Sequence, residues 1–314
     1  MNRILTVIIA FILIFALTAA LFPDFFSKET CTYEEASKRW AKGNFVTVEG
    51  KKIHYLEKGN GSPLIMIHGF LYHTVMWQKN IDALAEKFKV YAIDLWGFGY
   101  SERLGKMDYS FALYGKQVKG FMDALNIKQA TLLGQSMGGG ISVYVAAHYP
   151  EMVDRLILVA PAVIPYPDTL IGKIYKLPYV GEFLNAIPGD ALMTNKLKAI
   201  WFYDQGKVTD EYAKEVLQPL CIKGSHDSLM FILRNVLKEP FVEKEANQLA
   251  RLNKPILIIH GREDKAIPLN RAITLQKLWK GSKLAIFEKA GHSPHEEHPE
   301  KFNKLALDFL SERE

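Results

Sequence analysis

The feature that most constrains the fold of this chain is an alternation of short apolar runs with longer helical patterns. The apolar runs, rich in β-branched residues, predict strands at residues 64–67, 89–95, 130–133, 156–160, 255–260 and 283–288, after a strand pair at 45–49 and 52–57. Helical patterns lie near residues 76–87, 110–125, 137–148, 269–280 and 299–312. Because strands that alternate with helices build parallel sheets, we expect an α/β fold whose mostly parallel central sheet is covered by helices on both faces.

The alternation stops between about residues 162 and 248, where helical patterns, prolines and many aromatic residues occur. A helical cap inserted between two strands of one sheet explains both the break and the length of the chain. The sequence therefore predicts five parts: an anchor or signal sequence, a linker, a first core part, the cap and a second core part. Their bounds are 1–22, 23–44, 45–161, 162–248 and 249–314.

The composition is that of an ordinary globular protein. Of the 314 residues, 49% are hydrophobic and 23% are charged, which excludes a mainly disordered or fibrous chain. The net charge of +5 comes from scattered basic residues without a run of five, so the sequence does not predict nucleic-acid binding. Cys31 and Cys221 form no zinc-like pattern and leave open whether they pair. We expect no metal and no cofactor.

The N-terminus carries a long apolar segment. Residues 4–22 are 19 residues without a charge, and as a helix they would span about 28 Å, close to the hydrocarbon core of a bilayer. This favours an uncleaved single-pass membrane anchor. A cleaved signal peptide, which would give a secreted or periplasmic protein, is the main alternative, and a buried helix is the third. The flanking charges do not decide on which side of the membrane the rest of the chain lies.

The sharpest chemical signal is the stretch Gly134-Gln135-Ser136-Met137-Gly138, between a predicted strand and a predicted helix. A nucleophile on such a tight turn needs small neighbours, which Gly134 and Gly138 supply. The start of the helix then places backbone N–H groups and the helix dipole near developing negative charge. The pattern therefore predicts that Ser136 is a nucleophile.

This arrangement resembles the nucleophile elbow of the α/β-hydrolase superfamily, and the resemblance covers roughly residues 45–314. His68-Gly69-Phe70 follows a predicted strand, at the position of the family's second oxyanion donor. Residues 94–101, Asp-Leu-Trp-Gly-Phe-Gly-Tyr-Ser, are similar to the family's D-x-x-G-x-G-x-S loop. Gly291-His292, followed by Glu297 and Pro299, is similar to the pattern around the family's catalytic histidine.

The resemblance implies Ser136, Asp264 and His292 as the catalytic residues, in the chain order Ser, Asp, His. His292 follows the last predicted strand, and Asp264 matches the family's G-x-x-D after the preceding strand, with Glu263 as the local competitor. His295 and His298 are interpreted as surface or cap residues, and His68 as a residue that shapes its loop. The other histidines have no motif support: His54, His73, His148, His226 and His260.

The same resemblance implies an oxyanion hole formed by the backbone N–H groups of Phe70 and Met137, with Leu71 as the substitute for Phe70. One such donor is typically worth about 10²–10³ in turnover. Because donation uses the backbone, substitution of Phe70 should change access and shape more than the donor itself.

The leading functional interpretation is a membrane-associated serine ester hydrolase, a lipase or carboxylesterase that forms an acyl-enzyme on Ser136. The aromatic cap suits an apolar acyl chain, and the layout is similar to membrane-bound monoacylglycerol lipases and related carboxylesterases. A serine at the elbow argues against dehalogenases and epoxide hydrolases, whose nucleophile is aspartate. The alternatives on the same scaffold are a carbon–carbon bond hydrolase, an acyltransferase and a cofactor-free haloperoxidase. A non-catalytic ligand-binding receptor is the alternative from another class.

Overall fold

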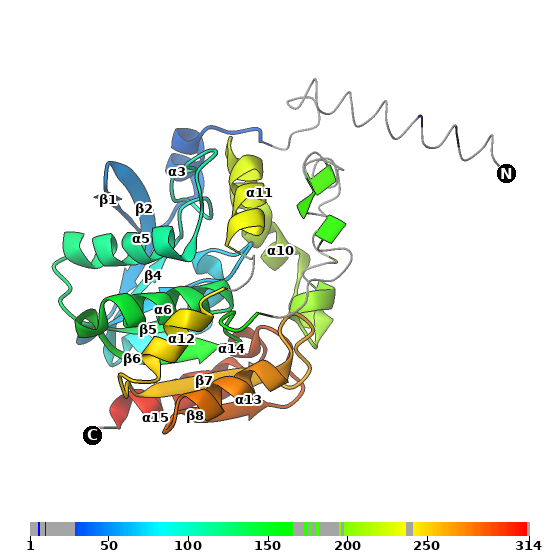
Figure 1. Ribbon diagram of the computed structural model, residues 1–314. Helices are drawn as coiled ribbons and strands as arrows, with labels where there is room; N and C mark the ends of the chain where they lie inside the picture. Colours follow the sequence, from blue (N-terminus) through cyan, green and yellow to red (C-terminus); the bar gives the residue numbers. More distant parts are fainter. Residues whose placement is uncertain are drawn as a thin grey trace.

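The computed structural model describes residues 29–165, 198–236 and 241–312, together with residues 6, 10, 173, 174, 176, 177, 180, 181 and 195. One eight-stranded sheet runs through its centre, in the order β1-β2-β4-β3-β5-β6-β7-β8 (Figure 1). The pairs β1–β2 and β2–β4 are antiparallel, and all the others are parallel, which confirms the predicted mostly parallel sheet. The strands are β1 (Asn44–Val48), β2 (Lys51–Lys58), β3 (Ser62–Ile67), β4 (Phe88–Ile93), β5 (Ala130–Gln135), β6 (Val153–Val159), β7 (Ile256–Gly261) and β8 (Lys283–Phe287).

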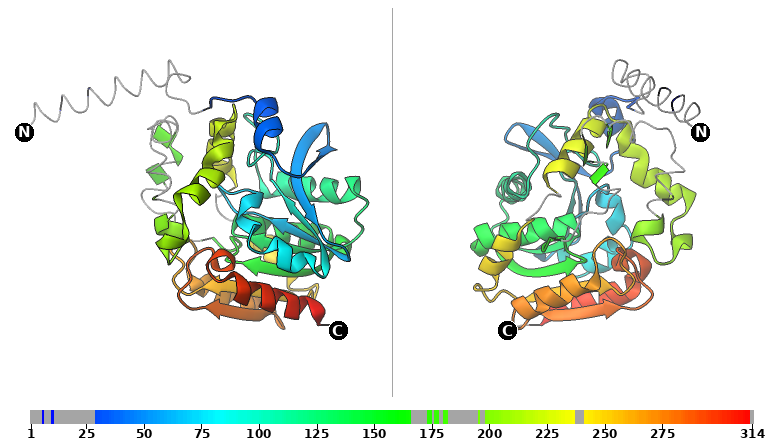
Figure 2. Two further views of the ribbon diagram at one scale, coloured as in Figure 1. Left: turned by 180° about the vertical axis from the view of Figure 1, so that it is seen from behind. Right: turned by 45° about the vertical axis from the view of Figure 1, so that its right-hand side comes forward.

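Helices cover both faces of the sheet because alternate residues of the central strands are apolar on both sides. In β3, Ile65 and Ile67 belong to one core cluster, whereas Leu64 and Met66 belong to a second. The first cluster includes residues of α5 (Phe111–Ala124), α6 (Met137–His148), α12 (Glu243–Leu249) and α13 (Leu269–Leu278). The second includes residues of α4 (Ile81–Ala85) and α15 (Pro299–Ser311). Figure 2 shows the two layers from two further sides.

The sequence between β6 and β7 contains helices that stand outside these two layers (Figures 1 and 2). They are η3 (Gln205–Lys207), α10 (Asp210–Leu217), η4 (Gln218–Cys221) and α11 (Ser225–Asn235), and α12 follows them on the sheet. This agrees with the predicted helical insertion, whereas the division into five parts stays a prediction. The remaining short helices are η1 (Thr74–Trp77), η2 (Pro150–Met152) and α14 (Pro294–Glu297).

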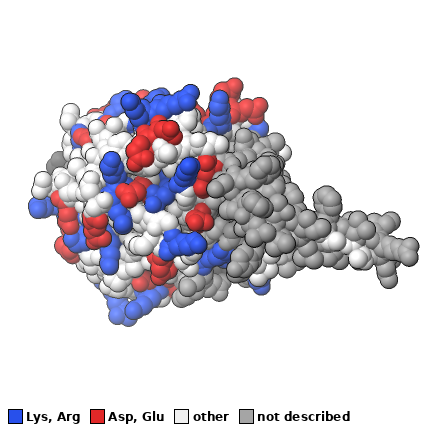
Figure 3. Space-filling view, turned by 90° about the horizontal axis from the view of Figure 1, so that it is seen from above, with Lys and Arg blue, Asp and Glu red and all other residues white. Residues whose placement is uncertain are grey.

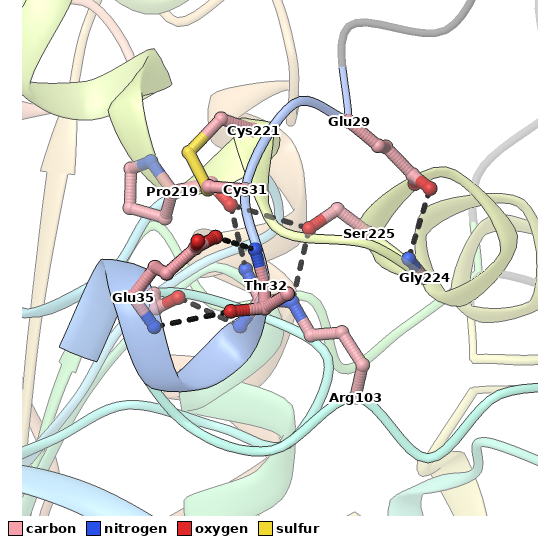
Figure 4. The surroundings of a disulfide bond; sticks show 10 residues. Glu29, Cys31, Thr32, Glu35, Arg103, Pro219, Cys221, Gly224 and Ser225 are labelled. Carbon is pink, nitrogen blue, oxygen red and sulfur yellow. Dashed lines mark hydrogen bonds between the residues drawn. A yellow bond between two sulfur atoms is a disulfide. The ribbon is translucent and has the colours of Figure 1, made fainter. Parts of the chain in front are cut away.

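Residues 29–42, which we call the N-terminal strap, join the helices of the insertion to the core. The strap contains α3 (Tyr33–Trp40), whose first turn is closed by a capping box between Thr32 and Glu35. A disulfide bond links Cys31 to Cys221 at the end of η4 (Figure 4). Two backbone hydrogen bonds of 3.0 Å flank it, one from Cys31 N to Cys221 O and one from Lys223 N to Cys31 O. The disulfide answers the question that the sequence left open.

The loop after β4 reaches the same insertion through one half-buried arginine, Arg103. Nη1 of Arg103 donates to the carbonyl oxygens of Phe98, Gly99 and Ser101, which closes the loop on itself. Nη2 donates to Pro219 O at 2.9 Å, and Nε donates to Ser225 Oγ at 3.0 Å (Figure 4). Arg103 therefore ties the core loop to η4 and α11.

The predicted membrane location requires a correction. Spanning a bilayer takes about 20 predominantly apolar helical residues. The longest helix of the described chain, α5, has 14, and the described residues contain no helix that is long and apolar enough to cross a membrane. The segment on which the prediction rested, residues 4–22, lies outside the described residues except for Thr6 and Ala10.

Basic and acidic side chains alternate over the face shown in Figure 3. The described chain also contains exposed ion pairs, such as Lys58–Asp82 and Arg262–Glu288. Exposed pairs of this kind contribute little to stability. On the described part of this face, neither sign of charge forms a continuous patch.

Candidate functional site

Ser136 lies on a sharp turn between β5 and α6, as the sequence predicts. Its backbone has φ 51° and ψ −115°, in the left-handed half of conformational space that a non-glycine residue rarely adopts. The turn needs glycine nearby: a methyl group on Gly138 would lie 2.2 Å from the carbonyl oxygen of Ile67. Because α6 starts at Met137, the N-terminal N–H groups of this helix lie next to Ser136.

Asp264 and His292 come from the loops after β7 and β8, at the same edge of the parallel sheet. Nδ1 of His292 lies 2.8 Å from Oδ2 of Asp264, and both side chains are buried. Oδ1 of Asp264 accepts hydrogen bonds of 2.8 Å from the backbone N–H groups of Ala266 and Ile267. These contacts fix the carboxylate behind the imidazole. The structure therefore pairs His292 with Asp264.

The electrostatics of Asp264 favour its charged form. Burial alone would raise the pKa of this carboxyl, but the neighbouring His292 and His260 outweigh that effect and hold its pKa well below the usual range. Nε2 of His260 lies 3.3 Å from Oδ2 of Asp264 and 2.9 Å from the carbonyl oxygen of Ile267. Glu263, the competitor considered from the sequence, accepts instead from the backbone N–H of Ala290 at 3.0 Å.

Two contacts place His292 near the elbow and the insertion. Gln135, the neighbour of Ser136, donates from Nε2 to the carbonyl oxygen of His292 at 3.0 Å. The ring of Trp201 meets the imidazole edge-on, with ring centroids 5.5 Å apart. Within the described chain, Nε2 of His292 has no hydrogen-bond partner, and no hydrogen bond joins it to Ser136. Catalytic hydrogen bonds of this kind often form only when substrate binds.

The two predicted oxyanion donors belong to segments that meet at Ser136. Met137 is the first residue of α6, so its N–H has no acceptor inside that helix. On the other side, a methyl group at Gly69 would lie 3.2 Å from Cβ of Ser136, which shows how closely the loop after β3 approaches. Phe70 is next in that loop, and Leu71 after it has φ 66°. The loop thus brings Phe70 and Leu71 to the elbow.

His68 shapes its loop, which confirms its predicted role. Its Nδ1 donates to Gly69 O at 2.7 Å, and its Nε2 accepts from the N–H of Leu95 at 2.9 Å. One donor and one acceptor require a neutral ring, and burial lowers the pKa of His68 to about 4.

The expectation for His295 is wrong, because this residue is fully buried instead of lying on the surface. Its ring stacks obliquely on Trp77, with ring centroids 4.6 Å apart. His298 is the N-cap residue of α15, in agreement with its interpretation as a cap residue. No local pattern indicates the burial of His295, because Trp77, on which it packs, is distant in the sequence.

Sequence reasoning also missed three residues that surround His292. Gln135 and Glu297 both lie inside motifs that it quoted, but their hydrogen bonds depend on loops that are distant in sequence. Trp201 was recognised only as one of many aromatic residues of the cap. Glu297 could have been singled out from its fixed place after Gly291-His292, since a buried acidic residue close to a candidate base calls for an explanation.

Comparison with known proteins agrees with this geometry. A family model described as alpha/beta hydrolase fold matches residues 62–191 and 235–299. The 2-hydroxymuconate semialdehyde hydrolase of Pseudomonas sp. (strain CF600) is 33% identical over 280 residues, which cover 86% of this chain and 94% of the relative. A solved meta-cleavage product hydrolase from Pseudomonas fluorescens is 29% identical, with a TM-score of 0.72 over 85% of this chain and 97% of that one.

A crystal structure of a membrane phospholipase A shares 22% identity and a TM-score of 0.72, covering 99% of this chain and 98% of that one. At this identity the likeness concerns the fold alone. The relatives named above are a 2-hydroxymuconate semialdehyde hydrolase and a meta-cleavage product hydrolase, and not the monoacylglycerol lipases that the sequence analysis favoured.

Proposed function

Because this chain belongs to the α/β-hydrolase fold family, we propose that it is a serine hydrolase that cleaves carbon–carbon bonds in 2-hydroxy-6-oxo-2,4-dienoate compounds. The carbon–carbon bond hydrolase, an alternative in the sequence analysis, thus replaces the ester hydrolase as the leading interpretation. The observation that carries the proposal is the similarity to 2-hydroxymuconate semialdehyde hydrolase over 86% of the chain, together with the His292–Asp264 pair beside the Ser136 elbow.

In the proposed reaction, Nε2 of His292 takes the proton of Ser136 Oγ as that oxygen attacks the C6 carbonyl of the substrate. Asp264 keeps the proton on Nδ1, so that Nε2 is free to act as a base. The backbone N–H groups of Phe70 and Met137 would then stabilise the oxyanion. A hole of this kind is typically worth about 10²–10³ in rate per donor.

The bond that breaks joins C6 to C5. As it breaks, C5 takes up the proton that Nε2 of His292 received from Ser136 and leaves as a 2-hydroxydienoate, while C6 stays on Ser136 as an ester. Water, deprotonated by His292, hydrolyses that ester and restores the serine. The net change is the addition of one water molecule across the C5–C6 bond. No step requires a metal or a redox cofactor.

The described surroundings of the elbow supply flat, apolar surfaces for a conjugated substrate. The rings of Phe70 and Phe98 meet edge-on, with centroids 5.9 Å apart. Trp201 packs on Tyr72, with centroids 4.6 Å apart and planes 30° apart. Aromatic side chains of this kind favour planar ligands. They suit an acyl chain as well, so products must separate the two reactions.

The proposal is tested by product analysis with wild type and Ser136→Ala side by side. The chromogenic probe is 2-hydroxy-6-oxo-6-phenylhexa-2,4-dienoate, and an ester panel from acetyl to palmitoyl, including monoacylglycerols, serves as the comparison. We expect Ser136-dependent release of benzoate and 2-hydroxypenta-2,4-dienoate in equal amounts. Ser136-dependent turnover confined to the esters would overturn carbon–carbon cleavage and restore the ester hydrolase. No Ser136-dependent turnover of either kind would remove both.

A further inference from the structure

Glu297 is a buried acidic residue whose carboxylate joins two distant segments. It ends α14, and its side chain is 1% exposed. Oε1 accepts a hydrogen bond of 2.6 Å from the backbone N–H of Gly291, which precedes His292. Oε2 accepts from the N–H groups of Tyr203 at 2.8 Å and Asp204 at 3.0 Å, in the insertion between β6 and β7. One carboxylate thus satisfies three backbone donors from two segments.

The same two segments meet at further points on both sides of His292. The N–H of Ser293, which follows His292, donates to the carbonyl oxygen of Trp201 at 3.2 Å. At Gly291 a methyl group would lie 2.9 Å from both Trp201 O and Tyr203 N, so the backbones are in direct contact. Lys207 donates from Nζ to the carbonyl oxygen of Glu297. Residues 201–204, the hinge segment, therefore touch the histidine loop before and after the imidazole.

We propose that Glu297 is a positioning residue that sets His292 by clamping the histidine loop, residues 291–297, onto the hinge segment. It does not touch the reacting atoms and acts through Gly291. The inference rests on the proposed function, because it assumes that His292 is the base. Because the carboxylate of Glu297 holds both the hinge segment and Gly291, a shift of the hinge segment would also move Nε2 of His292.

The chemistry of the donors explains why this position holds a carboxylate. Burial raises the pKa of Glu297, and the backbone N–H groups of Asp204, Gly291 and Tyr203 oppose that shift because they bind the charged form. The ionised side chain accepts at both oxygens and donates nothing, which matches three N–H groups divided between Oε1 and Oε2. A glutamine of the same shape has one accepting oxygen, and its NH₂ group would face a backbone donor. Glu297→Gln should therefore release one of the two segments without changing the volume of the side chain.

Glu296 provides a matched control next in the chain. It is also buried, and it accepts from the hydroxyl of Tyr212 in α10, so it contacts the insertion, while no hydrogen bond within the described chain joins its side chain to Gly291 or the hinge segment. Burial raises the pKa of Glu296 to about 8, so its side chain is mostly neutral at pH 7 and resembles glutamine. Glu296→Gln therefore makes the same substitution in the same short helix without removing the clamp.

The test compares both variants by the rate of Ser136 labelling with a fluorophosphonate, by kcat and KM, and by the pH profile of kcat/KM. For Glu297→Gln we expect labelling and kcat to fall together by about 10–100-fold, KM to stay within about threefold, and the lower limb of the pH profile to shift. Glu296→Gln should stay within about threefold of wild type in all of these. Active-site titration and circular dichroism at the assay temperature report the folded fraction.

Two results would overturn the positioning role: equal behaviour of the two variants, or a loss in Glu297→Gln that only follows its unfolded fraction. Wild-type protein that neither labels at Ser136 nor turns over any substrate would instead contradict the proposed function. If Glu297→Gln does not fold, Lys207→Met removes a weaker contact of the same clamp. It should then lower kcat by about two- to fivefold with KM unchanged, and an unchanged kcat would contradict the clamp.

Discussion

In the described part of the chain, two buried aspartates, Asp94 and Asp264, are each paired with the Nδ1 atom of a histidine, and only one of these two pairs belongs to the candidate site. Nδ1 of His54 lies 2.7 Å from Oδ2 of Asp94, much as Nδ1 of His292 lies 2.8 Å from Oδ2 of Asp264. Asp94 accepts from the N–H groups of Thr74 and Tyr100, as Asp264 accepts from two N–H groups of its own loop. Burial opposes the charge of Asp94, but the histidines around it hold its pKa well below the usual range, as for Asp264.

The two pairs differ at the second nitrogen of the imidazole. Nε2 of His54 donates to the carbonyl oxygen of Lys42, 2.5 Å away at the end of the N-terminal strap. Because both ring nitrogens face acceptors, His54 holds a proton on each. Burial alone would lower the pKa of His54, but Asp94 and the carbonyl group of Lys42 raise it by more, so its pKa lies above the usual value. Nε2 of His292 has no such partner among the described residues. A histidine–aspartate pair is therefore no signature of catalysis by itself: the partner of the second nitrogen decides.

The largest expected difference between the pairs is in turnover. His292→Gln should lower kcat by about 10⁴-fold, because it removes the proposed base, whereas folded His54→Gln should stay within about threefold of wild type. Both are measured with the best substrate of the product analysis, per active site. If folded His54→Gln were as inactive as His292→Gln, the claim that only the His292–Asp264 pair takes part in catalysis would be wrong.

The second expected difference is in stability and runs in the opposite direction. His54→Gln leaves the buried carboxylate of Asp94 without its charged partner and should lower the free energy of unfolding by about 3–5 kcal/mol. Both aspartates keep two backbone donors, but His292→Gln should cost less, because Asp264 also keeps His260 3.3 Å from its Oδ2. Urea unfolding of the two variants at pH 6 measures both values. Equal losses of unfolding free energy in the two variants would mean that the two histidine–aspartate pairs stabilise the fold equally.

The disulfide sharpens the comparison, because it holds the strap that His54 also binds. Replacing Cys31 and Cys221 with serine removes a cross-link between residues separated by 190 positions and should lower the free energy of unfolding by about 2–4 kcal/mol. The measurement is a urea midpoint with and without dithiothreitol, in wild type and the double variant. A midpoint that dithiothreitol shifts equally in both proteins would show that the effect does not come from this bond.

The smallest expected effect is the pH dependence of stability that comes from His54. A raised folded-state pKa adds stability that is fully present below the unfolded pKa, about 6.5, and is lost as the pH rises through the folded value. The stability difference between wild type and His54→Gln should therefore shrink from pH 6 to pH 9. Unfolding curves at three pH values test this. A stability difference that grows with pH would mean that the pKa of His54 is lowered, and not raised, in the folded protein.

Local patterns in the sequence predicted most of the sheet and the elements that carry the site. The periods of apolar residues placed β5 and α6 on either side of Ser136, since a strand, a tight turn and a helix are all local structures. The choice of Asp264 over Glu263 next to His292 also agrees with the structure. The roles of these residues in catalysis stay predictions.

The contacts that sequence reasoning missed all join segments far apart in the chain. His54 has no motif around it, and its partners lie 12 and 40 positions away. The partners of Glu297 in the hinge segment lie 93 and 94 positions away, and the two cysteines lie 190 apart. Such pairs depend on how the insertion and the strap pack on the core, and no periodicity encodes that. A single sequence shows which residue types are present, but it does not show which distant residues are in contact.

The parallel pairing of β6 with β7 has a consequence for how this architecture can be altered. Leu156 pairs with Ile256, and the chain between these neighbours leaves the sheet and returns to it. The entropy lost when such a loop closes grows only with the logarithm of its length, by about 0.6 kcal/mol for each doubling. The framework can therefore accept inserts of very different size at this position for little thermodynamic penalty. An engineer could exchange the insert to redesign selectivity while leaving the strands that carry Ser136, Asp264 and His292 in place.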